Sequence, residues 1–295
     1  MKYIKEHTNI PIPLILSFSN NTKDSLLGCE YILMEKIKGI TLSSFLENKN
    51  WEELPDTIIN QMLNYYKQIK SIKIKEIDKI GCFKENLEIS ELIFDGPVLN
   101  ISNNYLEYLN QQFIFVIKES KKIKKFKILG EKLEQIMNDL NKEIKLNPLV
   151  NNLNYNDEIT ISHGDLNSSN ILINPNTLDI TAILDWEFAC HNFDSVEYHF
   201  FENWLEKEED KIRIRQKIES KLNWPKKSEG FEVRKYFNKL LTEADQIGFY
   251  VSSWFNEYKN KELAIRYYLD AEFHIAMNLM KDAYKYINLI KNYKK

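Results

Sequence analysis

Two short segments in the second half of the sequence hold side chains that could carry out phosphoryl transfer. His163, Asp165 and Asn170 belong to the first segment, which reads H-G-D-L-N-S-S-N, and Asp185 belongs to the second, which reads I-L-D-W-E. The reaction needs a carboxylate that accepts the proton of the attacking hydroxyl, and oxygen ligands that hold a divalent cation on the phosphates. We therefore predict that Asp165 is the catalytic base and that Asn170 and Asp185 bind Mg²⁺.

The elements around these residues are predicted to be short strands joined by a loop and a tight turn. Runs rich in isoleucine favour strands, and the sequence N-P-N-T is typical of a turn. A hairpin with this turn returns to the end at which it started, so Asn170 and Asp185 are expected to lie close together. The strands are expected at residues 159–161, 171–173 and 180–184, the loop at 162–170, and the turn at 174–177.

The rest of the chain is predicted to begin with a small β-region and to continue mainly as helices. A short helix, two strands that pair as a hairpin, and a helix capped by Thr41 or Ser43 are expected first, followed by a longer helix capped by Asp56. One face of that helix carries the apolar residues Ile58, Ile59, Met62, Leu63, Tyr66 and Ile69. These first elements are expected at residues 2–7, 14–18, 30–35, 41–47 and from 56 onward.

Beyond that point the chain is expected to be irregular, then helical on both sides of the catalytic segments. Asp95-Gly96-Pro97 predicts a turn within an irregular stretch over 81–100. Residues 105–140 predict one or two helices, with Gly130 as the expected break between them. Helices are expected again after Phe193.

Composition favours a mostly helical chain and argues against several classes of protein. The 295 residues are 43% hydrophobic, with only 8 glycines and 7 prolines. A net charge of −3, from 40 basic and 43 acidic side chains, gives no electrostatic case for nucleic acid. We find no apolar run of about 18 residues and no apolar segment near Met1, so neither a membrane span nor a signal peptide is expected. Cys29, Cys82 and Cys190 lack disulfide or zinc spacing, which favours the cytoplasm.

The first catalytic segment resembles the H-x-D-x-x-x-x-N loop of kinases, with Gly164 at its second position. This glycine, and L-D-W-E where protein kinases have D-F-G, make it similar to the aminoglycoside phosphotransferase and choline kinase-like family of the protein-kinase-like superfamily. The passages N-I-P-I-P at 9–13 and Y-I-L-M-E-K-I-K-G at 31–39, followed by Leu42, resemble the same family, and the similarity extends to about Tyr198. The resemblance implies an ATP-dependent, Mg²⁺-dependent phosphotransferase that acts on a hydroxyl of a small molecule.

The resemblance also implies roles for residues outside the catalytic segments. Glu35 would offer a backbone carbonyl, and Ile37 a backbone amide, to the adenine ring. His163 is expected to hold the loop through packing and hydrogen bonds. Glu187 is either a group that supports the metal ligands or a surface charge.

Three acidic residues that follow the second segment have two possible roles. They could line a pocket for a cationic acceptor, or they could form a solvated helix face, which is the interpretation we favour. They are Asp194, Glu197 and Glu202.

Part of the family's nucleotide-binding machinery has no counterpart in the sequence. No glycine precedes Gly28 and no lysine lies on a predicted strand before residue 35, so the glycine-rich loop and the phosphate-binding lysine are absent. We expect an N-terminally truncated small lobe with an open sheet edge and an exposed apolar face. Two hypotheses stay open: an ATP-dependent small-molecule kinase, or a catalytically impaired kinase-like binding or regulatory module.

The expected fold is α+β and protein-kinase-like. An incomplete β-containing N-lobe with its hinge is predicted over 1–39. A mainly helical C-lobe that holds the catalytic loop and the metal-binding hairpin is predicted over 40–295. The resemblance implies a small-molecule hydroxyl acceptor. The sequence favours neither nucleic acid nor a membrane as a partner, and it gives no indication of an oligomeric state.

Overall fold

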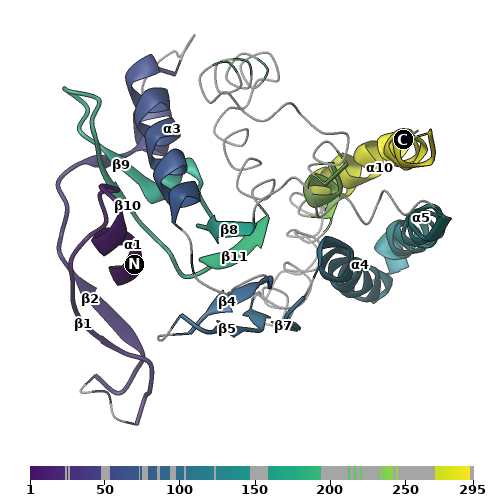
Figure 1. Ribbon diagram of the computed structural model, residues 1–295, viewed down its shortest axis with the longest axis horizontal. Coiled ribbons are helices and arrows are strands. Elements are labelled where there is room, and N and C mark those ends of the chain that lie inside the picture. The colour runs from purple at the N-terminus through teal and green to yellow at the C-terminus, as the bar shows by residue number, and fades with distance from the viewer. Residues whose placement is uncertain are drawn as a thin grey trace. The chain divides into compact units, whose positions relative to one another are not determined.

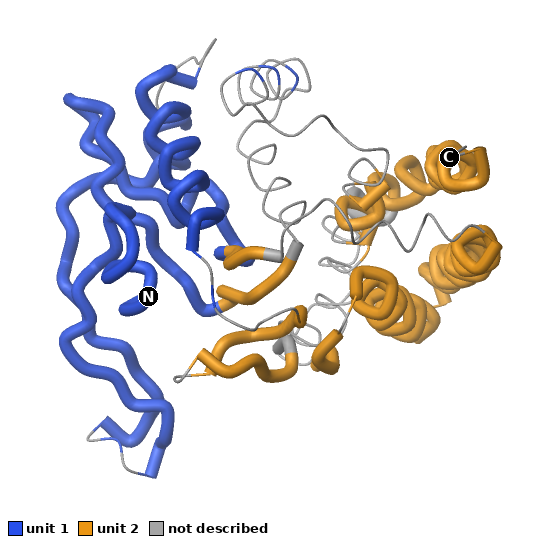
Figure 2. The backbone as a smooth tube through the Cα atoms, viewed as in Figure 1, with its two compact units in different colours: residues 1–74, 163–187, 200–224 blue, residues 75–162, 188–199, 225–295 orange. Residues whose placement is uncertain are grey.

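The computed structural model forms two compact units, each built from several stretches of the chain (Figures 1 and 2). Unit 1 contains residues 1–74, 163–187 and 200–224, and unit 2 contains residues 75–162, 188–199 and 225–295. The predicted boundary at residue 39 stays a prediction. The structure describes residues 1–23, 25, 27–47, 54–72, 74, 79–84, 87–93, 98–102, 104–122, 124–146, 159–193, 212, 216, 220, 233–234, 236–241, 244 and 270–292.

Unit 1 begins with a short helix and an antiparallel hairpin, as predicted. The helix is α1 (Lys2–His7), and the hairpin joins β1 (Ile15–Ser19) to β2 (Tyr31–Met34). Phe18 lies opposite Ile32, and a bulge shifts the register between residues 15 and 17. The hairpin forms a two-stranded sheet of its own.

A second sheet in unit 1 contains the two strands that connect the predicted site residues Asn170 and Asp185. Its strand order is β10 (Ile180–Ile183), β9 (Ile171–Ile173) and β3 (Ile40–Thr41). The predicted β9–β10 hairpin is confirmed, with Ile183 opposite Ile171. Helix α2 (Leu42–Glu47) starts directly after β3, and the Thr41 hydroxyl caps it by accepting a hydrogen bond from the Ser44 amide at 3.1 Å.

Helix α3 (Asp56–Ser71) buries all six apolar side chains that its spacing predicted. The predicted cap is wrong by one position, because Pro55 is the N-cap residue and Asp56 is the first helical residue. The Gln61 side chain joins α3 to the β9–β10 hairpin: its Nε2 donates to the Leu178 carbonyl at 3.0 Å, and its Oε1 accepts from the Ile180 amide at 2.9 Å.

Unit 2 contains a four-stranded sheet. Its order is β5 (Ile89–Ser90), β4 (Gly81–Phe83), β11 (Cys190–Phe193) and β8 (Ile159–Ser162). Strand β8 confirms the strand predicted at 159–161, whereas β4 and β5 lie where the sequence predicted irregular chain. A separate pair joins β6 (Leu92–Ile93) to β7 (Val98–Leu99). Strands of two or three residues carry too little periodicity to be recognised in a sequence. The predicted turn at residues 95–97 lies outside the described residues.

Long helices form the main core of unit 2. Helix α5 (Lys127–Leu146) contacts both α4 (Tyr105–Lys121) and α10 (Asp270–Asn292). The predicted break at Gly130 is wrong, because the break lies at residues 122–126, where a short 3-10 helix (Lys124–Phe126) precedes α5. Gly130 instead lies where α5 meets α4: an added Cβ would lie 3.1 Å from the Ile117 carbonyl oxygen. None of the helices in the described part of the chain is long and apolar enough to cross a membrane.

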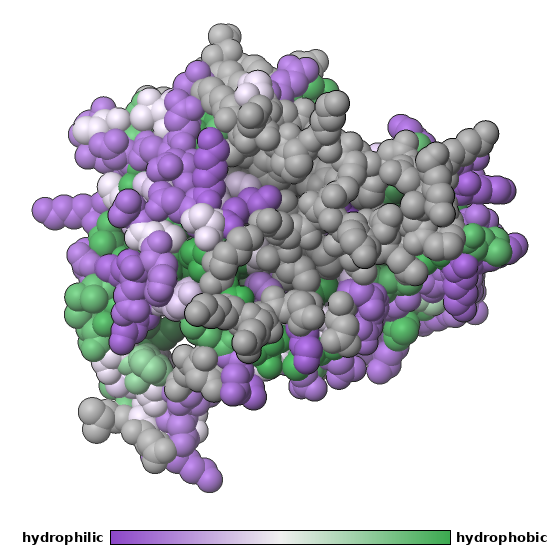
Figure 3. All heavy atoms as spheres, in the orientation of Figure 1, coloured by the Kyte–Doolittle hydropathy of each residue, from purple (hydrophilic) through white to green (hydrophobic). Residues whose placement is uncertain are grey.

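Large apolar side chains are exposed on the β1–β2 hairpin, as the sequence predicted. Leu16, Phe18 and Ile32 are 59%, 56% and 56% exposed. Figure 3 shows hydrophobic atoms gathered over this part of unit 1. Neither strand contains a lysine or a proline, the residues that commonly protect an edge strand.

Candidate active site

The loop between β8 and β9 holds the Asp165 carboxylate between two side-chain amides. Asn167 Nδ2 donates to Oδ1 of Asp165 at 3.0 Å, and Asn170 Nδ2 donates to Oδ2 at 3.0 Å. Burial raises the pKa of Asp165, the two amides lower it, and the charge of Asp185 raises it; the net direction is upward. A half-buried carboxylate with a raised pKa is suited to accept a proton.

Asn170 is oriented so that its side-chain oxygen is available as a ligand. Its Nδ2 group donates to the Asp165 backbone carbonyl at 2.9 Å as well as to the Asp165 carboxylate. Both partners are acceptors, so the nitrogen must face them and Oδ1 must point away. Within the described chain we find no hydrogen bond to this Oδ1. Because amide oxygens are good ligands of hard cations, Asn170 fits its predicted role.

Asp185 follows β10 and has a left-handed backbone, with φ of 60°. The preceding residue fixes this position: the Leu184 amide donates to the Asn170 carbonyl at 2.8 Å, and the Leu184 carbonyl bonds to His163 Nε2 at 2.8 Å. Asp185 is exposed, and no hydrogen bond to its carboxylate occurs among the described residues. These bonds bring Asn170 and Asp185 together, as the hairpin predicted.

His163 is buried, and its side chain connects the two segments by hydrogen bonds to residues of both. Its Nδ1 accepts from the Asp165 amide at 3.3 Å, so Nε2 carries the proton that is donated to the Leu184 carbonyl. Burial lowers the pKa of His163 to about 4, which keeps the ring neutral at pH 7. Its ring lies 4.5 Å from the ring of the buried Trp186. These contacts fit the predicted supporting role.

The other predicted site residues are Glu187, in the second segment, and Glu35 and Ile37, which follow β2. Glu187 is exposed. The Glu35 amide donates to the Leu14 carbonyl at 2.9 Å, and its Oε2 accepts from the Leu14 amide at 3.2 Å. In the described chain we find no hydrogen bond to the Glu35 carbonyl or from the Ile37 amide, and none from either residue to the catalytic loop. The acidic residues at 194, 197 and 202 lie outside the described residues.

Asn167 was not predicted as a site residue, although its side chain donates a hydrogen bond to the Asp165 carboxylate. Its signal was an asparagine two residues after the predicted base, a spacing at which an Asx side chain often bonds to nearby backbone groups.

The described residues offer few ligands to a cation at this site. Among the described residues, no group of three or more His, Cys, Asp or Glu side chains could hold a metal ion. The candidate ligands are therefore Asn170 Oδ1 and the Asp185 carboxylate. Few protein ligands, completed by substrate phosphates, are typical of Mg²⁺ sites in phosphotransferases.

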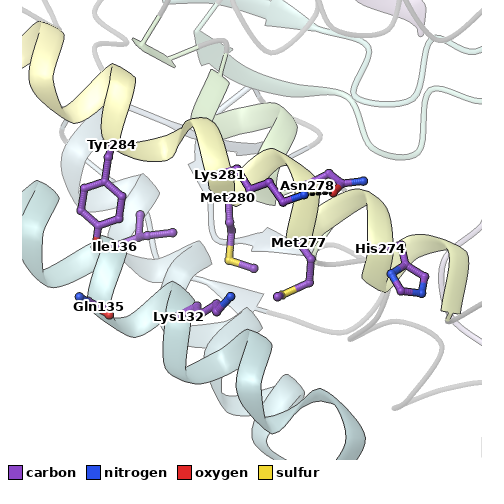
Figure 4. Close-up of a pocket in the computed structure, with 9 residues that line it drawn as sticks. All are labelled: Lys132, Gln135, Ile136, His274, Met277, Asn278, Met280, Lys281 and Tyr284. Carbon is purple, nitrogen blue, oxygen red and sulfur yellow. Dashed lines mark hydrogen bonds between the residues drawn. The ribbon is translucent and has the colours of Figure 1, made fainter.

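A separate hollow of about 680 Å³ lies in unit 2 between α5 and α10 (Figure 4). Ile136, Met277 and Met280 contribute apolar surface, and Lys281 Nζ donates to Asn278 Oδ1 at 2.8 Å beside them. None of the described lining residues is acidic, so they offer neither a carboxylate base nor a carboxylate ligand for a cation. The candidate active site is therefore the loop in unit 1.

Comparison with solved structures identifies the fold. An aminoglycoside phosphotransferase APH(4)-Ia variant, in a ternary complex with ADP and hygromycin B, aligns over 99% of this chain and 82% of its own, with 14% identity and a TM-score of 0.53. A mutant of aminoglycoside 2'-phosphotransferase-IIIa with GDP aligns over 96% and 78%, with 12% identity and a TM-score of 0.53. A Ralstonia eutropha protein with the provisional name aminoglycoside phosphotransferase aligns over 97% and 80%, with 14% identity and a TM-score of 0.58. The predicted kinase-like α+β fold is confirmed.

Sequence comparison gives the family. No curated protein matches the chain. The model of the APH phosphotransferase enzyme family matches residues 1–193, which include both catalytic segments. Because the match covers more than half of the chain and the fold agrees with it, this protein belongs to the APH phosphotransferase enzyme family.

Proposed function

We propose that the chain transfers the terminal phosphoryl group of ATP to a hydroxyl of a small molecule. The observation that carries this proposal is the hydrogen-bonded set formed by Asp165, Asn170 and Leu184, which fixes a carboxylate and an amide oxygen beside the carboxylate of Asp185. Membership of a phosphotransferase family supports the reaction class.

Asp165 acts as the base in this proposal. Its carboxylate accepts the proton of the acceptor hydroxyl as that oxygen attacks the phosphorus, and the bond from phosphorus to the leaving oxygen of ADP breaks. Both carboxylate oxygens bond to amide groups, so the side chain is already oriented before substrate binds. Each oxygen has a second lone pair that can receive the proton.

Asn170 and Asp185 would hold Mg²⁺. When bound, the cation neutralises the charge that develops on the phosphate oxygens. Asn170 contributes Oδ1, which its two donor contacts turn away from Asp165. Asp185 contributes an exposed carboxylate from a backbone position that Leu184 fixes on both sides.

The backbone around Glu35 and Ile37 would bind the adenine ring. A carbonyl and an amide two residues apart, without partners in the described chain, match one donor and one acceptor on the edge of a purine. We propose the cytoplasm as the protein's compartment, because the scattered spacing of Cys29, Cys82 and Cys190 favours a reducing environment.

A binding module that holds nucleotide without turnover is the second candidate function. The observation in its favour is that β1 and β2 contain neither lysine nor glycine, so neither strand offers the usual grip on the phosphates. In this case the site would bind nucleotide weakly and keep it intact.

One experiment separates the candidates. Purified protein is heated with and without Mg²⁺ and ATP or GTP, and phosphate transfer is measured with a panel of hydroxylated acceptors that includes hygromycin B. We expect the nucleotide to raise the melting temperature of both the natural chain and Asp165→Ala, and turnover only in the natural chain. Stabilisation without turnover in either protein would select the binding module. No stabilisation by either nucleotide would contradict both.

A further inference from the structure

Asn167 lies two residues after the proposed base, and both ends of its side-chain amide are engaged. Its Oδ1 accepts from the Ser169 amide at 2.8 Å, and its Nδ2 donates to Asp165 Oδ1 at 3.0 Å. A flipped amide would bring its NH₂ group against the Ser169 N–H and its oxygen against the Asp165 carboxylate. The Ser169 contact therefore dictates that a donor faces Asp165.

The two carboxylate oxygens of Asp165 therefore accept hydrogen bonds from different residues. Asn170 Nδ2 donates to Oδ2 at 3.0 Å, and it also donates to the Asp165 carbonyl at 2.9 Å. Without Asn167, the carboxylate would keep only the hydrogen bond from Asn170 to Oδ2. Oδ1 could then move as the carboxylate group rotates. With Asn167 present, the plane of the carboxylate is fixed at two points.

We infer that Asn167 is a positioning residue that fixes the orientation of Asp165 for proton transfer. The inference rests on the proposed function, since it assigns a role through Asp165. A positioning error at a catalytic base lowers the turnover rate and leaves substrate binding intact, because the substrate contacts are made by other groups.

Capping of the 3-10 turn at Ser168–Asn170 is the competing role for this side chain, and it depends only on Oδ1. Aspartate caps such turns as well as asparagine does. The variant Asn167→Asp therefore keeps the cap and replaces only the donor, so that two carboxylates face each other. A capping residue would tolerate this change and a positioning residue would not.

The kinetic test compares kcat and KM for the natural chain, Asn167→Asp and Asn167→Ala. We expect both variants to lose kcat by roughly tenfold to a hundredfold, with both KM values within about twofold. The alanine variant shows that the loss does not depend on the added charge. Asn104→Asp is the matched control: Asn104 Oδ1 caps α4 by accepting from the Glu107 amide at 2.9 Å, in unit 2.

A stability test does not depend on activity. Asn167→Asp alone should lower the urea midpoint of unfolding. The double variant Asn167→Asp with Asp165→Asn exchanges the amide and the carboxylate, which restores a donor–acceptor pair. Its urea midpoint should return most of the way to that of the natural chain, while the protein stays inactive. An Asn167→Asp chain with natural kcat, or a double variant without recovery, would overturn the inference. If the natural chain shows no turnover, the proposed function fails. The urea midpoint of the double variant then decides by itself whether Asn167 fixes the orientation of Asp165.

Discussion

The catalytic loop and the β1–β2 hairpin are both in unit 1, yet they are stabilised in opposite ways. In the loop, His163 is fully buried, and backbone and side-chain bonds connect residues 163, 165, 167, 170 and 184. In the hairpin, Leu16, Phe18 and Ile32 are more than half exposed, and among the described strands β1 and β2 pair only with each other. The segment that would perform the chemistry is therefore partly buried and cross-connected by side-chain bonds, whereas the hairpin is held by strand pairing and leaves large apolar side chains exposed.

This difference separates two requirements of a phosphotransferase. The proposed base and cation ligands are oriented by bonds within residues 163–187, and Gln61 and strand β3 hold the β9–β10 hairpin that connects them. A two-stranded hairpin is marginal by itself, because one face buries little apolar surface. We therefore expect changes in the loop to have large, specific effects, and changes in the hairpin to have small ones.

The largest effect is expected at Asp185. Asp185→Asn keeps the volume of the side chain and its tolerance of a left-handed backbone, but it removes the charge that would hold the cation. A loss of several kcal/mol of transition-state stabilisation corresponds to a fall in phosphotransfer of about a thousandfold. The measurement is the turnover rate of the natural chain and the variant at saturating Mg²⁺ and ATP.

Asp179→Asn is the control for that substitution. Asp179 lies in the same hairpin, at its turn, where its Oδ2 accepts from the Thr177 hydroxyl at 2.6 Å. It should keep its activity. An Asp185→Asn enzyme with kcat within threefold of the natural chain would show that the carboxylate is not a cation ligand.

The next effect is the pH dependence that His163 brings to folding. Its folded pKa is lowered to about 4, whereas the unfolded chain takes up the proton at about 6.5. As the pH falls from 6.5 to 4, the unfolded state binds a proton that the folded state does not, so stability decreases by about 3 kcal/mol. Below pH 4 this contribution is constant, and above pH 6.5 it vanishes.

Urea unfolding at several pH values measures this loss, and His163→Phe is the reference. Other groups titrate over the same range, so the slopes of the two proteins are compared. The phenylalanine variant is expected to be less stable at pH 7, because the Leu184 carbonyl loses its donor. It should also lose less stability between pH 6.5 and 4. Parallel curves for the two proteins would contradict the assignment of a buried neutral imidazole.

Two glycines test the same contrast through the backbone. Gly39 has φ of 153°, and an added Cβ would lie 2.8 Å from both the Ile173 carbonyl oxygen and Thr181 Oγ1. Gly28, between β1 and β2, has φ of 69° and nothing within 4 Å. We expect Gly39→Ala to cost roughly 3 kcal/mol through strain and crowding, and Gly28→Ala about 1 kcal/mol through strain alone. Equal losses in urea unfolding would show that crowding at β9 and β10 is absent.

The sequence predicted the local parts of this site well, for a physical reason. Loop, turn and strands at 162–183 follow from residue types that act over a few positions, such as the N-P-N-T turn and the isoleucine runs. The buried face of α3 follows from helical spacing, which does not depend on the rest of the fold.

The features that the sequence did not reveal depend on contacts between distant segments. Gly130 resembled a helix break, but its reason is the close approach of α4 to α5, which no local pattern encodes. The short strand β4 pairs with β5 on one side and on the other with β11, which lies more than a hundred residues further along the chain. Asn167 was missed because its role is visible only once both ends of its amide have partners.

The smallest effect on folding is expected on the hairpin. Phe18 and Ile32 lie opposite each other and are both 56% exposed, so Phe18→Thr and Ile32→Thr remove little buried apolar surface and keep β-branched or polar residues that suit a strand. We expect each to change the free energy of unfolding by less than about 0.5 kcal/mol, and both to reduce binding of a hydrophobic dye. A loss of about 2 kcal/mol or more would mean that another surface covers the hairpin in solution, and size-exclusion chromatography of the natural chain would then show whether that surface belongs to a second copy. Such a result would remove the contrast with the catalytic loop, because both regions would be buried in the functional protein.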